Sequence, residues 1–181
     1  VCPSGCLEAD EQGGPVAADP AMCNACGHCV AVCPHDALTH SRVDAAGVRE
    51  NLRVWPDAAV VDAMLRGRRS IRVYKDKPVA REVLAELVDV ARFAPTASNA
   101  QEVGWIIADD PAKVRELAVL TAAFFAASGA RPKYSALWDR GLDYFLRGAP
   151  ALAVAYAPAD APFGAGDCAI ALTFMELAAV A

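Results

Sequence analysis

Residues 23–34 read Cys-Asn-Ala-Cys-Gly-His-Cys-Val-Ala-Val-Cys-Pro, and this stretch decides how the N-terminal part of the chain folds. The spacing Cys-x2-Cys-x2-Cys-x3-Cys-Pro places three thiolates on a tight loop around one iron–sulfur cluster and directs the fourth toward a different cluster. Zinc is the main rival, but structural zinc sites usually pair two separated Cys-x2-Cys knuckles. The spacing therefore favours an iron–sulfur cluster.

The surrounding residues 1–42 are rich in loops and contain too few large apolar side chains to fold around a core of their own. A cluster would supply the missing cross-link. No signal peptide precedes the cysteines, and six of the seven cysteines lie within residues 1–33. This distribution suggests a reducing, cytoplasmic compartment.

The motif, together with Cys2-Pro3, resembles the two-cluster bacterial ferredoxins. In that family the cysteine before proline binds the cluster of the other motif. The resemblance implies five metal ligands in this chain, namely Cys2, Cys23, Cys26, Cys29 and Cys33. Cys2 would complete the cluster held by the three loop cysteines, and Cys33 would bind a second 4Fe-4S cluster whose other ligands precede this chain.

The remaining polar residues of this region receive simpler interpretations. We expect Cys6 to be a packed thiol, because a free cysteine is commonly a small buried hydrophobe, with a role as alternative ligand left open. His28 could influence the cluster potential through hydrogen bonding, but a solvent-facing loop position is favoured. His35 and His40 are expected to be solvent-facing too.

Beyond residue 56 the chain alternates helical and extended patterns, which predicts an α+β or α/β layered fold. The expected elements are a helix from Pro56-Asp57 to Gly67, an extended segment 68–74, a helix between Pro78 and Pro95, a strand 103–108, a helix starting at Asp110-Pro111, a helix 136–146, a strand 150–156 and a helix from Asp167. The helix after Pro111 is apolar on all sides around Phe124 and Phe125, which predicts that it is buried.

Two polar stretches of this region are candidates for binding an anionic, aromatic ligand. In an extended segment Arg68, Ser70 and Arg72 share one face and suit a phosphate, while Ile71 and Val73 would face the core. A basic surface stretch at a helix C-terminus is the alternative. Residues 94–101, Ala-Pro-Thr-Ala-Ser-Asn-Ala-Gln, offer hydroxyls and carboxamides that suit the edge of a flavin ring, or else form an ordinary polar loop.

Together these stretches resemble the FMN-dependent nitroreductase family over residues 57–181, and residues 141–144 and 147–150 resemble its branch fused to a ferredoxin. The resemblance implies interlocked homodimers and no catalytic side chain. It also implies FMN contacts from Arg68, Arg69, Ser70 and Arg72 at the phosphate and ribityl end, and from Thr96, Ala97, Asn99 and Gln101 of the partner subunit at the ring.

We therefore expect an α+β chain with three parts: a ferredoxin-like 4Fe-4S domain at 1–42, a linker at 43–56 and a nitroreductase-like FMN domain at 57–181. The chain starts without methionine and stops within a helical pattern, so a fragment truncated at both ends is expected. The expected cofactors are one 4Fe-4S cluster in this fragment, two in the complete protein, and FMN.

The expected function is an oxidoreductase that passes electrons between the clusters and FMN to reduce a nitroaromatic, quinone or similar acceptor, with NAD(P)H or reduced ferredoxin as donor. A non-enzymatic electron carrier and a redox-sensing module remain alternatives. The net charge of −5 argues against nucleic-acid binding, the apolar runs are too short to span a membrane, and no G-x-G-x-x-G follows a strand. We expect a soluble protein.

Overall fold

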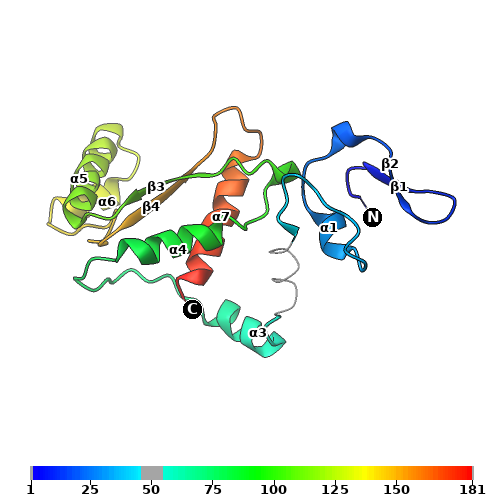
Figure 1. Ribbon diagram of the computed structural model, residues 1–181. Coiled ribbons are helices and arrows are strands. Elements are labelled where there is room, and N and C mark those ends of the chain that lie inside the picture. Colours follow the sequence, from blue (N-terminus) through cyan, green and yellow to red (C-terminus); the bar gives the residue numbers. More distant parts are fainter. Residues whose placement is uncertain (1, 46–54, 181) are drawn as a thin grey trace. The chain divides into compact units, whose positions relative to one another are not determined.

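The computed structural model describes residues 2–45 and 55–180, and the chain divides into two compact units (Figure 1). Unit 1 comprises Val1–Ala63 together with the short segment Thr96–Gln101, and unit 2 comprises Met64–Pro95 and Glu102–Ala181. Most of the expected linker at 43–56 lies outside the described residues. Within the described residues, no helix is long and apolar enough to cross a membrane.

Unit 1 is built from short elements joined by loops. They are β1 (Leu7–Ala9), β2 (Pro15–Ala17), η1 (Pro20–Met22), α1 (His28–Val32) and η2 (Ala97–Asn99). The strands β1 and β2 pair antiparallel. Among the described residues of this unit, only Cys6 and Val30 are buried apolar side chains. The poor apolar core that the composition predicts is therefore confirmed.

The helix α3 (Ala58–Gly67) begins and ends where the sequence predicts. The Asp57 carboxylate accepts a hydrogen bond from the Ala59 N–H at 2.7 Å, which satisfies one of the free donors of the first turn. The sequence also predicted α4 (Arg81–Ala91), which follows Pro78 and ends before Pro95.

Unit 2 packs helices against a two-stranded antiparallel sheet, which confirms the α+β class (Figure 1). Its other elements are β3 (Gly104–Ala108), α5 (Pro111–Ser128), α6 (Pro132–Trp138), β4 (Leu152–Tyr156) and α7 (Gly164–Ala178). The helix α7 packs against both α4 and β4. Gly104 lies opposite Tyr156, and a Cβ at Gly104 would collide with the tyrosine ring.

The expectation that α5 is buried was wrong. Its buried residues are Val114, Ala118 and Ala122, which lie four residues apart and form one narrow stripe. Phe124 is 65% exposed, as is Leu120. The helix is thus buried along this stripe alone, and Leu120 and Phe124 lie outside it.

Two other expectations differ from the structure. Residues 68–74 form no strand, and Ile71 and Val73 are 64% and 88% exposed instead of facing the core. The alternating polar and apolar side chains of residues 68–74 therefore lie on the surface of the protein. The helix expected at 136–146 is α6, which ends at Trp138, and the following residues form a turn instead.

Asp143 organises that turn. Its carboxylate accepts hydrogen bonds from the N–H groups of Phe145, Leu146 and Gly148, each at 2.9 Å. Partial burial acts to raise the pKa of the Asp143 carboxyl, but these backbone donors outweigh it and hold the pKa below the ordinary value of 3.8. The turn places the Phe145 ring in a stack on Phe125, with ring centroids 5.3 Å apart.

We expect Asp143→Ala to lower the free energy of unfolding by about 1–2 kcal/mol, because three backbone donors lose their acceptor. Because the folded-state pKa is lowered, the stabilisation is complete above pH 3.8 and is lost as the pH falls through the folded-state value. Urea denaturation of both proteins between neutral and acidic pH measures this difference. The exposed Asp160→Ala is the matched control, and an equal loss in that variant would contradict the assignment.

Candidate functional site

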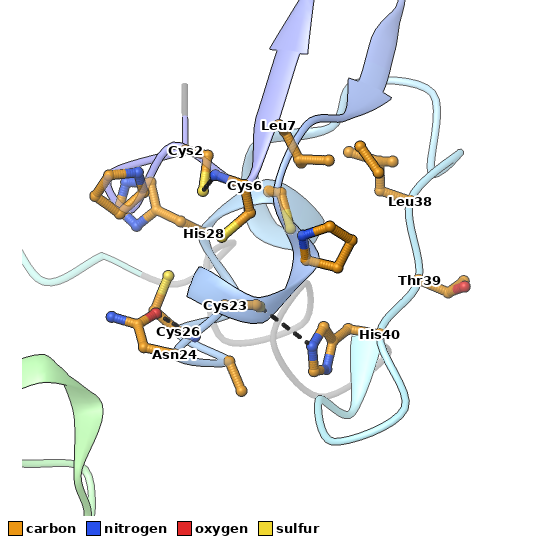
Figure 2. A pocket seen from close by; sticks show the side chains of 16 residues that line it. Cys2, Cys6, Leu7, Cys23, Asn24, Cys26, His28, Leu38, Thr39 and His40 are labelled. Atoms are coloured by element: carbon orange, nitrogen blue, oxygen red, sulfur yellow. Dashed lines mark hydrogen bonds between the residues drawn. The ribbon is translucent and has the colours of Figure 1, made fainter.

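A cavity of about 240 Å³ in unit 1 gathers most of the cysteines that the sequence singled out (Figure 2). The cysteines that line it are Cys2, Cys6, Cys23, Cys26 and Cys29. The cavity thus brings together the four residues expected to hold one cluster. Cys33 is not among the lining residues, as expected for a ligand of a different cluster.

The loop that carries three of these cysteines is shaped by local hydrogen bonds and by left-handed backbone. The Asn24 side chain accepts a hydrogen bond from the Cys26 N–H at 3.3 Å. Ala25 and Gly27 adopt φ values of 54° and 74°, which turn the chain tightly before α1 begins at His28. A Cβ at Gly27 would lie 3.3 Å from a Val43 methyl carbon, so the close packing there favours glycine.

The two Cys-Pro sequences form matching turns. The Cys2 sulfur accepts the N–H of Cys6 at 3.3 Å, and the Cys33 sulfur accepts the N–H of Ala37 at 3.3 Å. Donation from the Cys6 and Ser4 backbone lowers the pKa of the Cys2 thiol, and donation from the His35 and Ala37 backbone lowers that of Cys33. Both sulfurs are thereby prepared to act as thiolate ligands.

Cys6 differs from the cysteines expected to bind metal. Its side chain is 6% exposed, and burial, followed by the neighbouring Cys2 and Cys23, raises its pKa to about 11. Cys6 occupies in the first Cys-Pro turn the place that Ala37 has in the second. A protonated, buried thiol at a small-residue position supports the interpretation of Cys6 as a packing residue.

The donor set fits a 4Fe-4S cluster. Over residues 2–45 and 55–180, no group of three or more His, Cys, Asp or Glu side chains is close enough to hold one metal ion. Four thiols around a cavity of about 240 Å³ instead leave room for a group of several atoms. Cysteine thiolates are the ligands that hold 4Fe-4S clusters.

Sequence reasoning missed His40. We expected His40 to face solvent, but it lines the cavity, and its Nε2 lies 3.6 Å from the Cys23 sulfur (Figure 2). No spacing rule could connect these residues, because 17 positions separate them. His28 also lines the cavity, although its side chain is exposed. His35 is exposed, as expected.

In unit 2, three of the four residues expected at the FMN phosphate lie together. The Arg68 guanidinium approaches the Ser70 hydroxyl at 3.5 Å, and the Arg72 guanidinium donates to the Ser70 carbonyl at 3.3 Å. Arg68 also pairs with the Glu176 carboxylate at 2.8 Å. Arg69 turns elsewhere and donates to backbone carbonyls at the end of α3.

In unit 1, the segment Thr96–Gln101 forms a strained and highly connected loop. Ser98, Asn99 and Gln101 have φ values of 51°, 55° and 56°, a conformation that costs free energy for residues other than glycine. Thr96 Oγ1 accepts the Gln101 N–H at 3.0 Å, and the Gln101 carboxamide donates to Asn99 Oδ1 at 3.0 Å. The Asn99 carboxamide in turn donates to the backbone carbonyl of Asn24 at 2.9 Å.

Comparison with known families finds a match for each of the two parts of the chain. Residues 65–181, more than half of the chain, match the nitroreductase family. Residues 16–39 match the 4Fe-4S binding domain. The order of the two matches is the one that the sequence predicted.

Individual relatives point the same way. A chloronitrobenzene nitroreductase from Comamonas testosteroni is 30% identical over 81 residues, 44% of this chain and 36% of that protein, so the chain spans about a third of this relative. A nitroreductase from Desulfitobacterium hafniense with bound FMN superposes with a TM-score of 0.55 at 25% identity, over 64% of this chain and 63% of the other. A Bacteroides fragilis nitroreductase shares the fold, with a TM-score of 0.56 at 24% identity over 66% and 63% of the two chains.

We expect Cys26→Ser to abolish most of the bound iron and acid-labile sulfide per chain, because a thiolate ligand is lost at the cavity. Chemical analysis of protein purified without oxygen measures both. Cys6→Ala is the matched control and should retain the wild-type content, since the Cys6 thiol is buried and protonated. Equal loss of iron in the two variants would contradict the assigned ligand set.

Proposed function

Because the chain belongs to the nitroreductase family and carries a 4Fe-4S binding domain before its nitroreductase domain, we propose that it is an FMN-dependent oxidoreductase fed by an iron–sulfur module. When both cofactors are bound, electrons pass one at a time between cluster and flavin, and the flavin reduces a nitroaromatic, quinone or similar acceptor. FMN in the Desulfitobacterium neighbour and the nitroaromatic substrate in the name of the Comamonas relative support this assignment.

One hydrogen bond carries the proposal. The Asn99 carboxamide, in the loop that resembles a flavin-binding segment, donates to the carbonyl of Asn24, which lies between Cys23 and Cys26 of the cluster loop. Both segments belong to unit 1. A direct contact between the two loops would hold the cluster side and the flavin side in a fixed geometry, as electron exchange requires.

We assign the iron–sulfur ligands as the sequence predicted. Cys2, Cys23, Cys26 and Cys29 hold one 4Fe-4S cluster at the cavity, and Cys33 serves a second. The position of Cys2, Cys23, Cys26 and Cys29 around one cavity supports the first of these assignments. The buried and protonated Cys6 remains outside the ligand set.

At the phosphate end of FMN we propose Arg68, Ser70 and Arg72. The Arg68 guanidinium lies at the Ser70 hydroxyl and the Arg72 guanidinium at the Ser70 backbone carbonyl, and guanidinium and hydroxyl donors suit an oxyanion. Arg69 joins them only if its guanidinium leaves the end of α3. The Glu176 carboxylate holds Arg68 in place and also competes with the phosphate for it.

At the ring end we propose Thr96, Ala97, Asn99 and Gln101, contributed by the partner subunit of a homodimer. The exposed apolar side chains of α5, among them Leu120 and Phe124, support such a dimer, because large exposed apolar patches mark interfaces. We also propose that the ferredoxin-like domain comprises residues 1–42 and the FMN domain residues 57–181. The proposed electron donor is NAD(P)H or reduced ferredoxin.

We expect Arg72→Ala to weaken FMN binding by about tenfold or more, the loss expected for a charge-assisted hydrogen bond. Cluster content should not change, because Arg72 lies in unit 2 and the cavity in unit 1. Fluorescence titration with FMN measures the affinity, and the exposed Arg140→Ala is the matched control. Unchanged FMN affinity in Arg72→Ala would overturn the phosphate assignment.

The proposed electron path is tested by removing the cluster and keeping the flavin. In anaerobic stopped-flow experiments with a one-electron donor, we expect flavin reduction in Cys26→Ser to be at least about tenfold slower than in the wild type, because the donor loses its route through the cluster. FMN content should be the same in both proteins. Equal rates of flavin reduction would show that the cluster is not on the path.

A further inference from the structure

His40 is held at the cavity by a tight turn. The Val43 N–H donates to the His40 carbonyl at 3.1 Å, and the two residues form an antiparallel bridge. The Arg42 N–H donates to His40 Nδ1 at 3.1 Å, so the turn fixes the imidazole ring as well as the backbone. The other ring nitrogen, Nε2, then lies 3.6 Å from the Cys23 sulfur (Figure 2).

The Arg42 contact decides which nitrogen carries the proton. A backbone N–H directed at Nδ1 requires a lone pair there, so the single proton of a neutral imidazole resides on Nε2. That nitrogen faces the Cys23 sulfur and can only donate to it.

We propose that His40 is a positioning residue that donates an Nε2–H hydrogen bond to the Cys23 thiolate and thereby raises the reduction potential of the cluster that Cys23 ligates. This inference rests on the proposed iron–sulfur site. One-electron reduction adds a negative charge that the ligand sulfurs share, and a donor hydrogen bond stabilises the more negative state more strongly. The hydrogen bond from His40 would therefore make the cluster easier to reduce.

The surroundings strengthen this effect. Apolar side chains, including Leu7 and Leu38, line the cavity beside His40, and a hydrogen bond in such a setting is stronger than one in water. His40 is half-buried, whereas His35 is exposed and does not line the cavity. His35 therefore provides a matched control with the same side chain in the same module.

The test is an EPR-monitored redox titration of the anaerobically purified holoprotein. In His40→Leu we expect the ratio of reduced to oxidised cluster at a fixed potential to fall about fivefold, the effect of one net hydrogen bond, which corresponds to about 40 mV at 59 mV per tenfold. His40→Gln, which retains an N–H donor, should recover part of the shift, and His35→Leu should show none. An unchanged midpoint in His40→Leu overturns the proposal.

A second measurement leaves His40 in place and decides the question if His40→Leu fails to retain a cluster. Pulsed EPR of the reduced protein labelled with 15N-histidine should detect a weakly coupled histidine nitrogen in the wild type that persists in His28→Leu, since His28 also lines the cavity. Absence of this coupling, or its loss in His28→Leu, overturns the proposal. A wild-type protein that contains no cluster overturns the proposed function instead, so the two failures are distinguishable.

Discussion

The N-terminal unit depends on its thiols because it has almost no apolar core. Among its described residues only Cys6 and Val30 are buried apolar side chains, and the cysteines surround a cavity. Conformational entropy opposes the folding of such a loop-rich segment, and a bound cluster is the interaction strong enough to offset it. This dependence on a cluster explains why so many local contacts position the cysteines. They include the turns at Cys2 and Cys33, the left-handed residues of the cluster loop and the contact of His40 with Cys23.

A second feature of this unit is the loop that we propose to contact the flavin. Three non-glycine residues of the segment Thr96–Gln101 adopt left-handed backbone, which persists only where surrounding contacts hold it. The hydrogen bonds among Thr96, Asn99 and Gln101, and the one to Asn24, provide those contacts. The same carboxamides that would contact a flavin therefore connect the loop to the cluster loop.

Much of this could be predicted from local sequence signals. Caps and breakers such as Asp57, Gly67 and Asp110-Pro111 placed helix ends correctly, because their effects act within one turn. The cysteine spacing singled out Cys23, Cys26 and Cys29, and the ferredoxin resemblance added Cys2; all four line the cavity, together with Cys6. Both family resemblances were confirmed by matches in the predicted order.

What failed depended on packing between distant residues. Phe124 and Val73 are exposed because no distant part of the chain that the structure describes packs over their side chains. The hydrophobicity of a segment does not specify which other segment packs against it. The contact between His40 and Cys23 was not predicted, because a turn and not a sequence motif brings the two residues together.

The central claim is that one chain carries both an iron–sulfur cluster and FMN. Anaerobic purification of the full-length protein, followed by assay of iron, acid-labile sulfide and extracted FMN per chain, tests it most directly. The account predicts cluster and FMN together in the same purified protein. A protein with iron and sulfide but no flavin absorption and no extractable FMN would contradict it and favour a simple electron carrier.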